Sequence, residues 1–217
     1  MMKEHLSTCL LFALLSPVTS LTCSNCRLPR DYDACDVVKN PHRVCRSYGI
    51  CSSGVLQSNI LQCYQKETYR QCEDPNFCHS GDYSVTAAEG KFLWTKVFCC
   101  RTELCNLEPL HLPPREDLLP NGLHCPACYS MVGTRTPHNC QNQGNVSCLA
   151  YETKCIDYSS MLVFDHDIFD LIFQGCASED MCALDGKHFS FGYIALINVK
   201  AKCYDPEKSS RQIDLKG

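Results

Sequence analysis

The chain of 217 residues contains twenty cysteines, the side chains of this sequence that are best suited to form covalent bonds or bind metal ions. Two Cys-x2-Cys pairs, Cys23 with Cys26 and Cys125 with Cys128, have the local spacing of zinc ligands. A zinc site needs four ligands, however, and 102 residues separate Cys23 from Cys125. So many cysteines are typical of disulfide scaffolds in oxidising compartments. We therefore expect disulfide bonds and no metal site.

Residue patterns that support catalysis give no clear signal. The sequence contains neither a G-x-S-x-G nor an H-E-x-x-H motif, and its eight histidines are scattered. His166 lies between Asp165 and Asp167, which could suggest acid–base chemistry or metal binding, but we favour the interpretation that these residues form a polar hairpin tip. We expect a protein that is not an enzyme and uses no cofactor.

The two ends of the chain indicate its compartment. Lys3 precedes a short apolar run, Leu6 to Leu15, and Val18 to Ser20 are small residues suited to cleavage, as in a signal peptide. The apolar run is shorter than the roughly 20 residues that span a membrane. The polar tail, residues 206–217, lacks the hydrophobic stretch of a lipid-anchor signal. We expect a signal peptide at 1–20 and a secreted, extracellular protein without a membrane anchor.

The remaining cysteines repeat one pattern twice, with eight positions in the same order. The first series is Cys23, Cys26, Cys35, Cys45, Cys51, Cys72, Cys78, Cys99, Cys100 and Cys105, and the second is Cys125, Cys128, Cys140, Cys148, Cys155, Cys176, Cys182 and Cys203. Repetition of this kind indicates two copies of one structural unit. We place them at 21–108 (the first half) and 123–205 (the second half), with a proline-rich linker at 109–122.

Each half is too short to rely on a large hydrophobic interior. With fewer than 90 residues, it gains only a few kcal/mol from its core, whereas one disulfide contributes about 3 kcal/mol in the chain-entropy model. Segments such as Lys91 to Phe98 and His188 to Lys200 are rich in aromatic and β-branched residues and are bounded by glycine-containing turns. The sequence predicts an all-β protein built of hairpins.

Charge restricts the classes of partner. The first half carries ten basic and ten acidic side chains, and the second half carries five basic and nine acidic ones, a net charge of −4. Because no basic patch is present, we expect no nucleic-acid partner. Asn145 begins the single Asn-x-Ser/Thr sequon and is a candidate glycosylation site.

The first half opens with Leu-x-Cys-x2-Cys at Leu21 and ends with Cys99-Cys100-x4-Cys105-Asn106, and this combination resembles the Ly-6/urokinase-receptor (LU) family. The resemblance implies two tandem disulfide-rich three-finger domains, in which a disulfide knot holds three β-hairpins. It implies the bonds Cys23–Cys51, Cys26–Cys35, Cys45–Cys72, Cys78–Cys99, Cys100–Cys105, Cys125–Cys155, Cys128–Cys140, Cys148–Cys176 and Cys182–Cys203.

The second half departs from this pattern at its end, because Tyr204 replaces the second adjacent cysteine and the last disulfide is lost. The segments 120–129, 153–157 and 175–178 resemble those of gamma-type phospholipase A2 inhibitors, whose second domain also stops soon after the eighth cysteine. This likeness implies a binding protein that inhibits a secreted phospholipase A2. The alternative is a secreted ligand or modulator of a cell-surface receptor.

Cys63 has no partner in the implied scheme. An odd cysteine in a secreted protein is either an inert buried thiol, or the site of an intermolecular bond or a capped reactive thiol. We keep these alternatives, of which the intermolecular bond would give a disulfide-linked dimer.

The second finger of the second half is the candidate surface for partner contact. Its apolar residues Phe164, Ile168 and Phe169 stand among the acidic residues Asp165 and Asp167, and such a mixture suits a protein interface with a basic partner. Packing against the other half, or pairing in a sheet, would explain the same residues.

Trp94, the single tryptophan, is a further candidate anchor in the third finger of the first half. Half-buried packing is the alternative explanation for this side chain.

Overall fold

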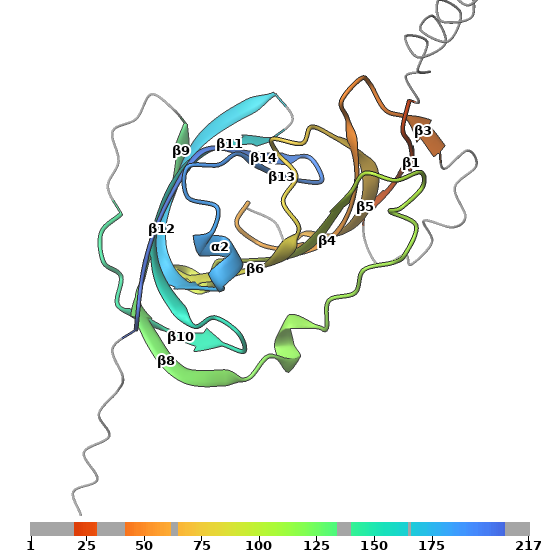
Figure 1. The fold of residues 1–217 in the computed structure, drawn as a ribbon. Coiled ribbons are helices and arrows are strands. Elements are labelled where there is room, and N and C mark those ends of the chain that lie inside the picture. The colour runs from red at the N-terminus through yellow and green to blue at the C-terminus, as the bar shows by residue number, and fades with distance from the viewer. Residues whose placement is uncertain (1–19, 30–41, 62–64, 134–139, 165, 207–217) are drawn as a thin grey trace, which may run out of the picture.

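The computed structural model describes residues 20–29, 42–61, 65–133, 140–164 and 166–206, and these residues form an almost entirely β structure (Figure 1). The described helical segments are one turn of α-helix, α2 (Glu179–Cys182), and two short 3-10 turns, η2 (Ala88–Gly90) and η3 (Arg115–Asp117). No helix in this part of the chain is long and apolar enough to cross a membrane. The all-β, disulfide-rich fold class is confirmed.

Fourteen strands are described, seven in each half. Those of the first half are β1 (Thr22–Ser24), β2 (Cys26–Pro29), β3 (His42–Val44), β4 (Ile50–Ser58), β5 (Gln65–Glu73), β6 (Gly81–Ala87) and β7 (Phe92–Cys100). Those of the second half are β8 (Pro120–Pro126), β9 (Cys128–Gly133), β10 (Asn145–Leu149), β11 (Lys154–Phe164), β12 (Asp167–Ala177), β13 (Phe189–Phe191) and β14 (Ile194–Tyr204).

One ten-stranded sheet runs through both halves, in the order β13-β14-β11-β12-β6-β7-β4-β5-β2, and β9 pairs with β12 beside this path. The halves join where the end of β12 runs antiparallel to β6, with Gly175 opposite Ala87 and Ala177 opposite Val85. Two small sheets, β1 with β3 and β8 with β10, stand apart from the large one.

The large sheet curls, so its far end returns to the first half, and Figure 1 shows strands curving around α2. The Ser190 amide in β13 donates a 3.0 Å hydrogen bond to the carbonyl of Phe77, which follows β5. The ring of Phe77 stacks on that of His188 with centroids 5.2 Å apart. The two halves therefore touch both at the β12–β6 joint and at this closure.

The largest hydrophobic core of the described residues fills the curl. It contains Leu56, Tyr69 and Leu93 from the first half and Leu162 and Phe173 from the second, all with almost no exposed surface. The sequence suggests a small interior for each half, whereas the structure shows a common one.

The segment expected to be a linker, 109–122, also contributes to the fold. β8 begins at Pro120, inside that range, and η3 lies within it. The Gln57 side chain donates a 3.1 Å hydrogen bond to the Pro113 carbonyl, so the segment is held against the first half.

Eight disulfides are described, and each pair is among those implied by the family resemblance. They are Cys23–Cys51, Cys45–Cys72, Cys78–Cys99, Cys100–Cys105, Cys125–Cys155, Cys128–Cys140, Cys148–Cys176 and Cys182–Cys203. Cys26 is also disulfide-bonded. Cys35 and Cys63 lie outside the described residues. Every described bond lies within one half of the chain.

Asn106, which follows the last cysteine of the first half, is fully buried and ties three segments together. Its side-chain oxygen accepts a 2.9 Å hydrogen bond from the Ser24 amide, and its nitrogen donates to the carbonyls of Ser24 and Ser52 at 3.0 and 2.8 Å. One amide side chain thus satisfies buried backbone groups of β1 and β4, which would otherwise destabilise the fold.

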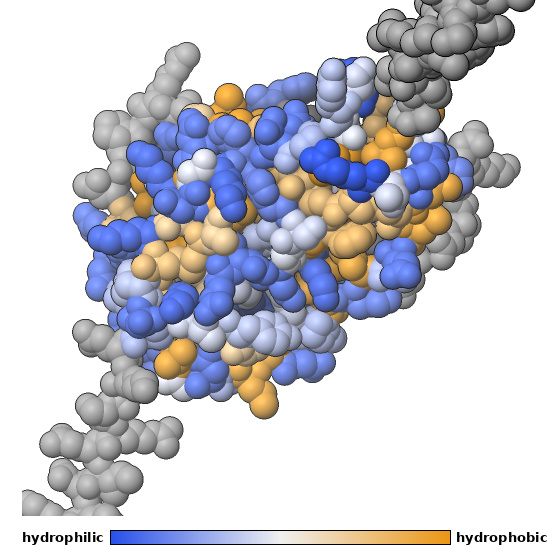
Figure 2. Space-filling view, viewed as in Figure 1, coloured by the Kyte–Doolittle hydropathy of each residue, from blue (hydrophilic) through white to orange (hydrophobic). Residues whose placement is uncertain are grey.

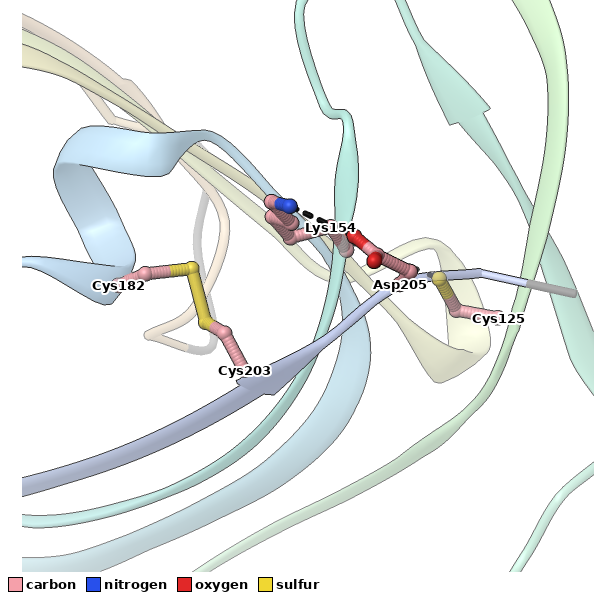
Figure 3. A network of polar contacts seen from close by, with 5 residues as sticks. All are labelled: Cys125, Lys154, Cys182, Cys203 and Asp205. Atoms are coloured by element: carbon pink, nitrogen blue, oxygen red, sulfur yellow. Dashed lines mark hydrogen bonds and ion pairs between the residues drawn. A yellow bond between two sulfur atoms is a disulfide. The ribbon is translucent and has the colours of Figure 1, made fainter.

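The second half closes differently, as the sequence departure at Tyr204 suggests. Tyr204 lies opposite Cys155 in the sheet, just as Cys100 lies opposite Cys51 in the first half. Where the first half then forms Cys100–Cys105, the second half has an ion pair between Lys154 Nζ and Asp205 Oδ1 at 2.6 Å (Figure 3). Both groups are accessible to solvent, so this pair is a weak substitute for a covalent bond.

Glu152 is a buried carboxylate at the junction of the halves. Its Oε1 accepts hydrogen bonds from the hydroxyls of Ser84 and Thr86 in β6, at 2.7 and 2.9 Å. Arg115 in η3 donates a 2.6 Å bond to Thr86 Oγ1. Burial raises the pKa of Glu152, and these hydrogen bonds and the Arg115 charge oppose that rise only in part. The network joins β6, η3 and the β10–β11 turn.

Gly175 provides the first test of the joint between the halves. A Cβ atom at this position would lie 2.0 Å from the Thr86 carbonyl oxygen and 3.0 Å from the Ala87 Cα, so β12 and β6 approach closely only because the side chain is absent. We predict that Gly175→Ala lowers the free energy of unfolding by about 3 kcal/mol. Gly133→Ala is the matched control, because nothing lies within 4 Å of a Cβ there. Urea unfolding measured by Trp94 fluorescence would show equal stability of both variants if the joint is unimportant.

The raised pKa of Glu152 leads us to predict that the stability of the fold depends on pH. Its pKa is higher in the folded chain than in the unfolded chain, so its contribution to stability is largest below about pH 4.3, the usual glutamate value, and is lost as pH rises through the folded-state pKa. Glu152→Gln removes this titration. We expect the stability of the variant relative to wild type to increase between about pH 4 and pH 7. Denaturation at a series of pH values measures this difference, and a constant or decreasing difference would contradict the assignment.

Candidate partner-binding surface

The candidate surface is the tip of the long hairpin formed by β11 and β12. The two strands pair without interruption from Lys154 opposite Ala177 to Phe164 opposite Asp167. β14 pairs with the other side of β11, and Phe164 lies opposite Ile194 there. Further down the hairpin the buried ring of Tyr158 stacks on Phe173, with centroids 4.4 Å apart. A strand paired on both sides and packed below its end holds its tip in a fixed position.

The residues proposed from the sequence divide into two groups at this tip. Ile168 is 49% exposed, and Asp167 is exposed beside it. Phe164 and Phe169 are partly buried and pack against the shared core. Their side chains therefore mainly support the tip, and little of their surface is exposed to a partner. Asp165 lies outside the described residues.

Trp94 does not belong to a binding surface. It lies in β7 with 1% of its surface exposed, and its indole N–H donates a 2.9 Å hydrogen bond to Asp82 Oδ1. Gln57, which bonds to Pro113, and Ser84, which bonds to Glu152, lie opposite it on the neighbouring strands. The prediction that this tryptophan anchors a partner is wrong, because the fold already covers its ring and satisfies its only polar group.

Tyr193 is a surface residue that the sequence pattern does not single out. It is 63% exposed and occupies the turn between β13 and β14, next to Gly192, whose φ of 62° favours glycine. Asp167 lies opposite Phe164 on one side of β11 and Ile194 lies opposite it on the other, so Ile168 and Tyr193 flank the tip from the two sides of β11. Gly192 within the apolar run from Phe189 is the sequence signal for this turn. We call Asp167, Ile168 and Tyr193 the tip surface.

The tip surface is acidic. Between Tyr158 and Phe173 the sequence contains three aspartates and neither lysine nor arginine. Glu67 of β5 adds a carboxylate nearby, since its Oε1 would lie 3.0 Å from a Cβ atom at Gly192. An exposed isoleucine and tyrosine surrounded by carboxylates suit a partner that is apolar at the contact and basic around it.

Clustered cysteine sulfurs could suggest a metal site elsewhere. Two groups, Cys23 with Cys45 and Cys72, and Cys125 with Cys148 and Cys176, have their sulfur atoms within 4.8 Å of one another. All six sulfurs are in disulfides, whereas a metal needs thiolates. These clusters are neighbouring disulfides that hold each group of strands together.

The chain is similar to several known proteins, although no family model matches it. A gamma-type phospholipase A2 inhibitor subunit of Elaphe climacophora is 30% identical over 137 residues, which are 63% of this chain and 64% of that protein. The phospholipase A2 inhibitor 25 kDa subunit of Naja kaouthia is 32% identical over 136 residues, which are 62% of this chain and 69% of that protein. Protein RoBo-1 of Rattus norvegicus is 30% identical over 125 residues, 58% of this chain and 48% of that protein.

The match to the Elaphe climacophora protein thus spans slightly less than two thirds of that protein's length. The crystal structure of mouse TEX101 aligns with 86% of this chain and 99% of its own at 16% identity, with a TM-score of 0.33. The likeness to the Naja kaouthia subunit covers more than two thirds of that protein. Its identity and coverage show that the chain belongs to the Ly-6/urokinase-receptor family, to which the gamma-type phospholipase A2 inhibitors also belong.

Proposed function

We propose that this chain is a secreted, non-enzymatic binding protein that inhibits a secreted phospholipase A2 by covering part of the enzyme's surface. The observation that carries the proposal is the tip surface, a fixed hairpin end with exposed apolar side chains among carboxylates, in a chain several of whose relatives are named phospholipase A2 inhibitors. Secretion through a signal peptide at 1–20 is part of the same proposal.

The proposed inhibition needs no chemistry from this chain. Ile168 and Tyr193 would lose their exposed surface to the partner, and burying apolar area of this kind contributes about 25 cal/mol per Å². The acidic residues around them would speed the encounter with a basic enzyme and make it sensitive to salt. Because the hairpin is packed against the core below its tip, little ordering free energy is spent on binding.

Ile168→Ser tests this surface in the full chain. We predict about tenfold weaker binding and inhibition of a basic secreted phospholipase A2, because a central apolar contact contributes roughly 1–2 kcal/mol or more. Leu119→Ser is the matched control, since Leu119 is also an exposed aliphatic side chain but lies just before β8, away from the tip. Surface plasmon resonance at low and high salt measures both variants.

The outcomes of this experiment distinguish a wrong target enzyme from a wrong binding site on this chain. Absence of binding by the wild-type chain to both basic and acidic secreted phospholipases would contradict the proposed target. Binding that Ile168→Ser and Leu119→Ser weaken equally would keep the target and reject the tip surface as its site.

A further inference from the structure

A second exposed aromatic residue stands on the first half, at the turn between β3 and β4. Tyr48 is 93% exposed, and its backbone has a φ of 70°, in the left-handed region. This conformation is unfavourable for a residue other than glycine, and a ring in solvent gains no packing that offsets the cost. Stability of the fold therefore gives no reason for a tyrosine at this position.

The turn that presents Tyr48 is firmly held. Cys45 is bonded to Cys72, and its amide donates a 2.7 Å hydrogen bond to the Leu21 carbonyl. The Gly49 amide donates to the Arg46 carbonyl at 2.9 Å, which closes the turn. The ring is thus offered to solvent from a constrained backbone, which lowers the ordering cost of binding.

Charged side chains of both signs lie around Tyr48, with the arginines and the acidic residues on different walls of one groove. The turn borders a groove of about 570 Å³, lined by Arg43 and Arg46. Both arginines are exposed, and neither guanidinium group has a hydrogen-bond or ion-pair partner among the described residues. Across the groove, Glu73 accepts a 2.7 Å bond from the Gln71 side chain and Asp74 accepts a 2.8 Å bond from the Asn76 amide. Each of these acidic groups thus has a hydrogen-bond partner on its own wall of the groove, whereas the guanidinium groups of Arg43 and Arg46 have none within the described part of the chain.

Apolar surface accompanies these charges. Val44, at the end of β3, is exposed together with Tyr48. Figure 2 shows hydrophobic side chains gathered on the viewed face around β1, β4 and β5, with strongly hydrophilic side chains beside them. We call Arg43, Val44, Arg46 and Tyr48 the Tyr48 surface. Tyrosine and arginine are among the residues most enriched at the energetic centres of protein interfaces.

We propose that the Tyr48 surface binds an acidic, partly apolar segment of a partner protein, at a site separate from the tip surface. A guanidinium group pairs well with a carboxylate, and Val44 and Tyr48 offer contact area to apolar side chains of the same segment. A uniform polyanion such as a sulfated polysaccharide fits less well, because it offers no apolar side chains to the exposed Val44 and Tyr48. With carboxylates at the tip surface on one half and two arginines beside Tyr48 on the other, the chain would engage two different partners.

Binding of a synthetic peptide to the full, disulfide-bonded chain tests this proposal. The probe is a fluorescent peptide in which glutamates alternate with leucine and phenylalanine, and its control carries glutamine in place of glutamate. We expect the acidic peptide to bind more tightly than the control. Tyr48→Asn, and separately Arg43→Gln with Arg46→Gln, should each weaken binding about tenfold. Lys200→Gln with Lys202→Gln, two exposed lysines of β14, is the matched control and should change nothing.

Thermal unfolding distinguishes a binding role for Tyr48 from a structural one. Asparagine tolerates the left-handed backbone better than tyrosine does, so Tyr48→Asn should leave the melting temperature unchanged or raise it. A lower melting temperature would show that the ring supports the fold and would overturn the proposal. Equal binding of the acidic and glutamine peptides, or tighter binding of heparin than of the acidic peptide, would also overturn it. Inhibition of phospholipase A2 is a separate readout and need not change in these variants.

Discussion

In the part of the chain that the structure describes, non-covalent contacts hold the two halves together beyond their connecting segment, and the rest of the structure depends on these contacts. Every described disulfide lies within one half, so the halves are held by the β12–β6 pairing, the closure at β13 and the common core. Hydrogen bonds extend the joint beyond the strand ends, where Ser178 and Ser84 bond to each other through backbone and hydroxyl groups at 2.9 and 3.0 Å. The close approach is sterically permitted because position 175 carries no side chain.

Disulfides and burial therefore stabilise different parts of the molecule. The bonds at Cys23, Cys45 and their counterparts fix the strand ends of each half, in small clusters made largely of cysteine. The contact of Tyr83 with Phe189, with centroids 4.4 Å apart, belongs instead to the shared interior. A half taken alone would expose that interior to water. The same interior also holds the tip surface in place, because Phe164 and Phe169 pack against this interior just below the exposed residues.

The sequence predicts local features of this fold well and long-range ones poorly. The cysteine series and the Cys105-Asn106 ending indicate the fold class and the family, because each half repeats a pattern set by its own covalent bonds. The β12–β6 pairing could not be predicted, because strands of different repeats meet here and neither cysteine spacing nor alternation records such a partner. The burial of Trp94 is of the same kind. Its neighbours Gln57 and Ser84 contact Pro113 and Glu152, which lie far from them in the sequence.

Two exposed aromatic residues show a further feature that the sequence pattern does not predict, namely which side chains a turn exposes to solvent. Tyr193 falls in an apolar run that suits a continuous strand, and only Gly192 marks the turn that exposes it. Tyr48 precedes Gly49, so the sequence alone would assign the left-handed backbone conformation to the glycine. In the structure Tyr48 has this conformation, and Gly49 is needed for another reason, because a Cβ atom there would crowd Cys45. In both places the residue that contacts solvent is decided by backbone conformation, which pattern alone does not specify.

Cleavage of the chain between the halves tests the common interior most directly. A protease site inserted between Leu107 and Leu110 lies in an exposed segment, and its cleavage under non-reducing conditions leaves every described disulfide intact. If burial and strand pairing hold the molecule together, the cleaved halves will elute from a sizing column as one particle at the position of the uncut chain and separate only in denaturant. Elution as two smaller, folded particles in native buffer would show that the halves are independent domains, and would contradict a common interior.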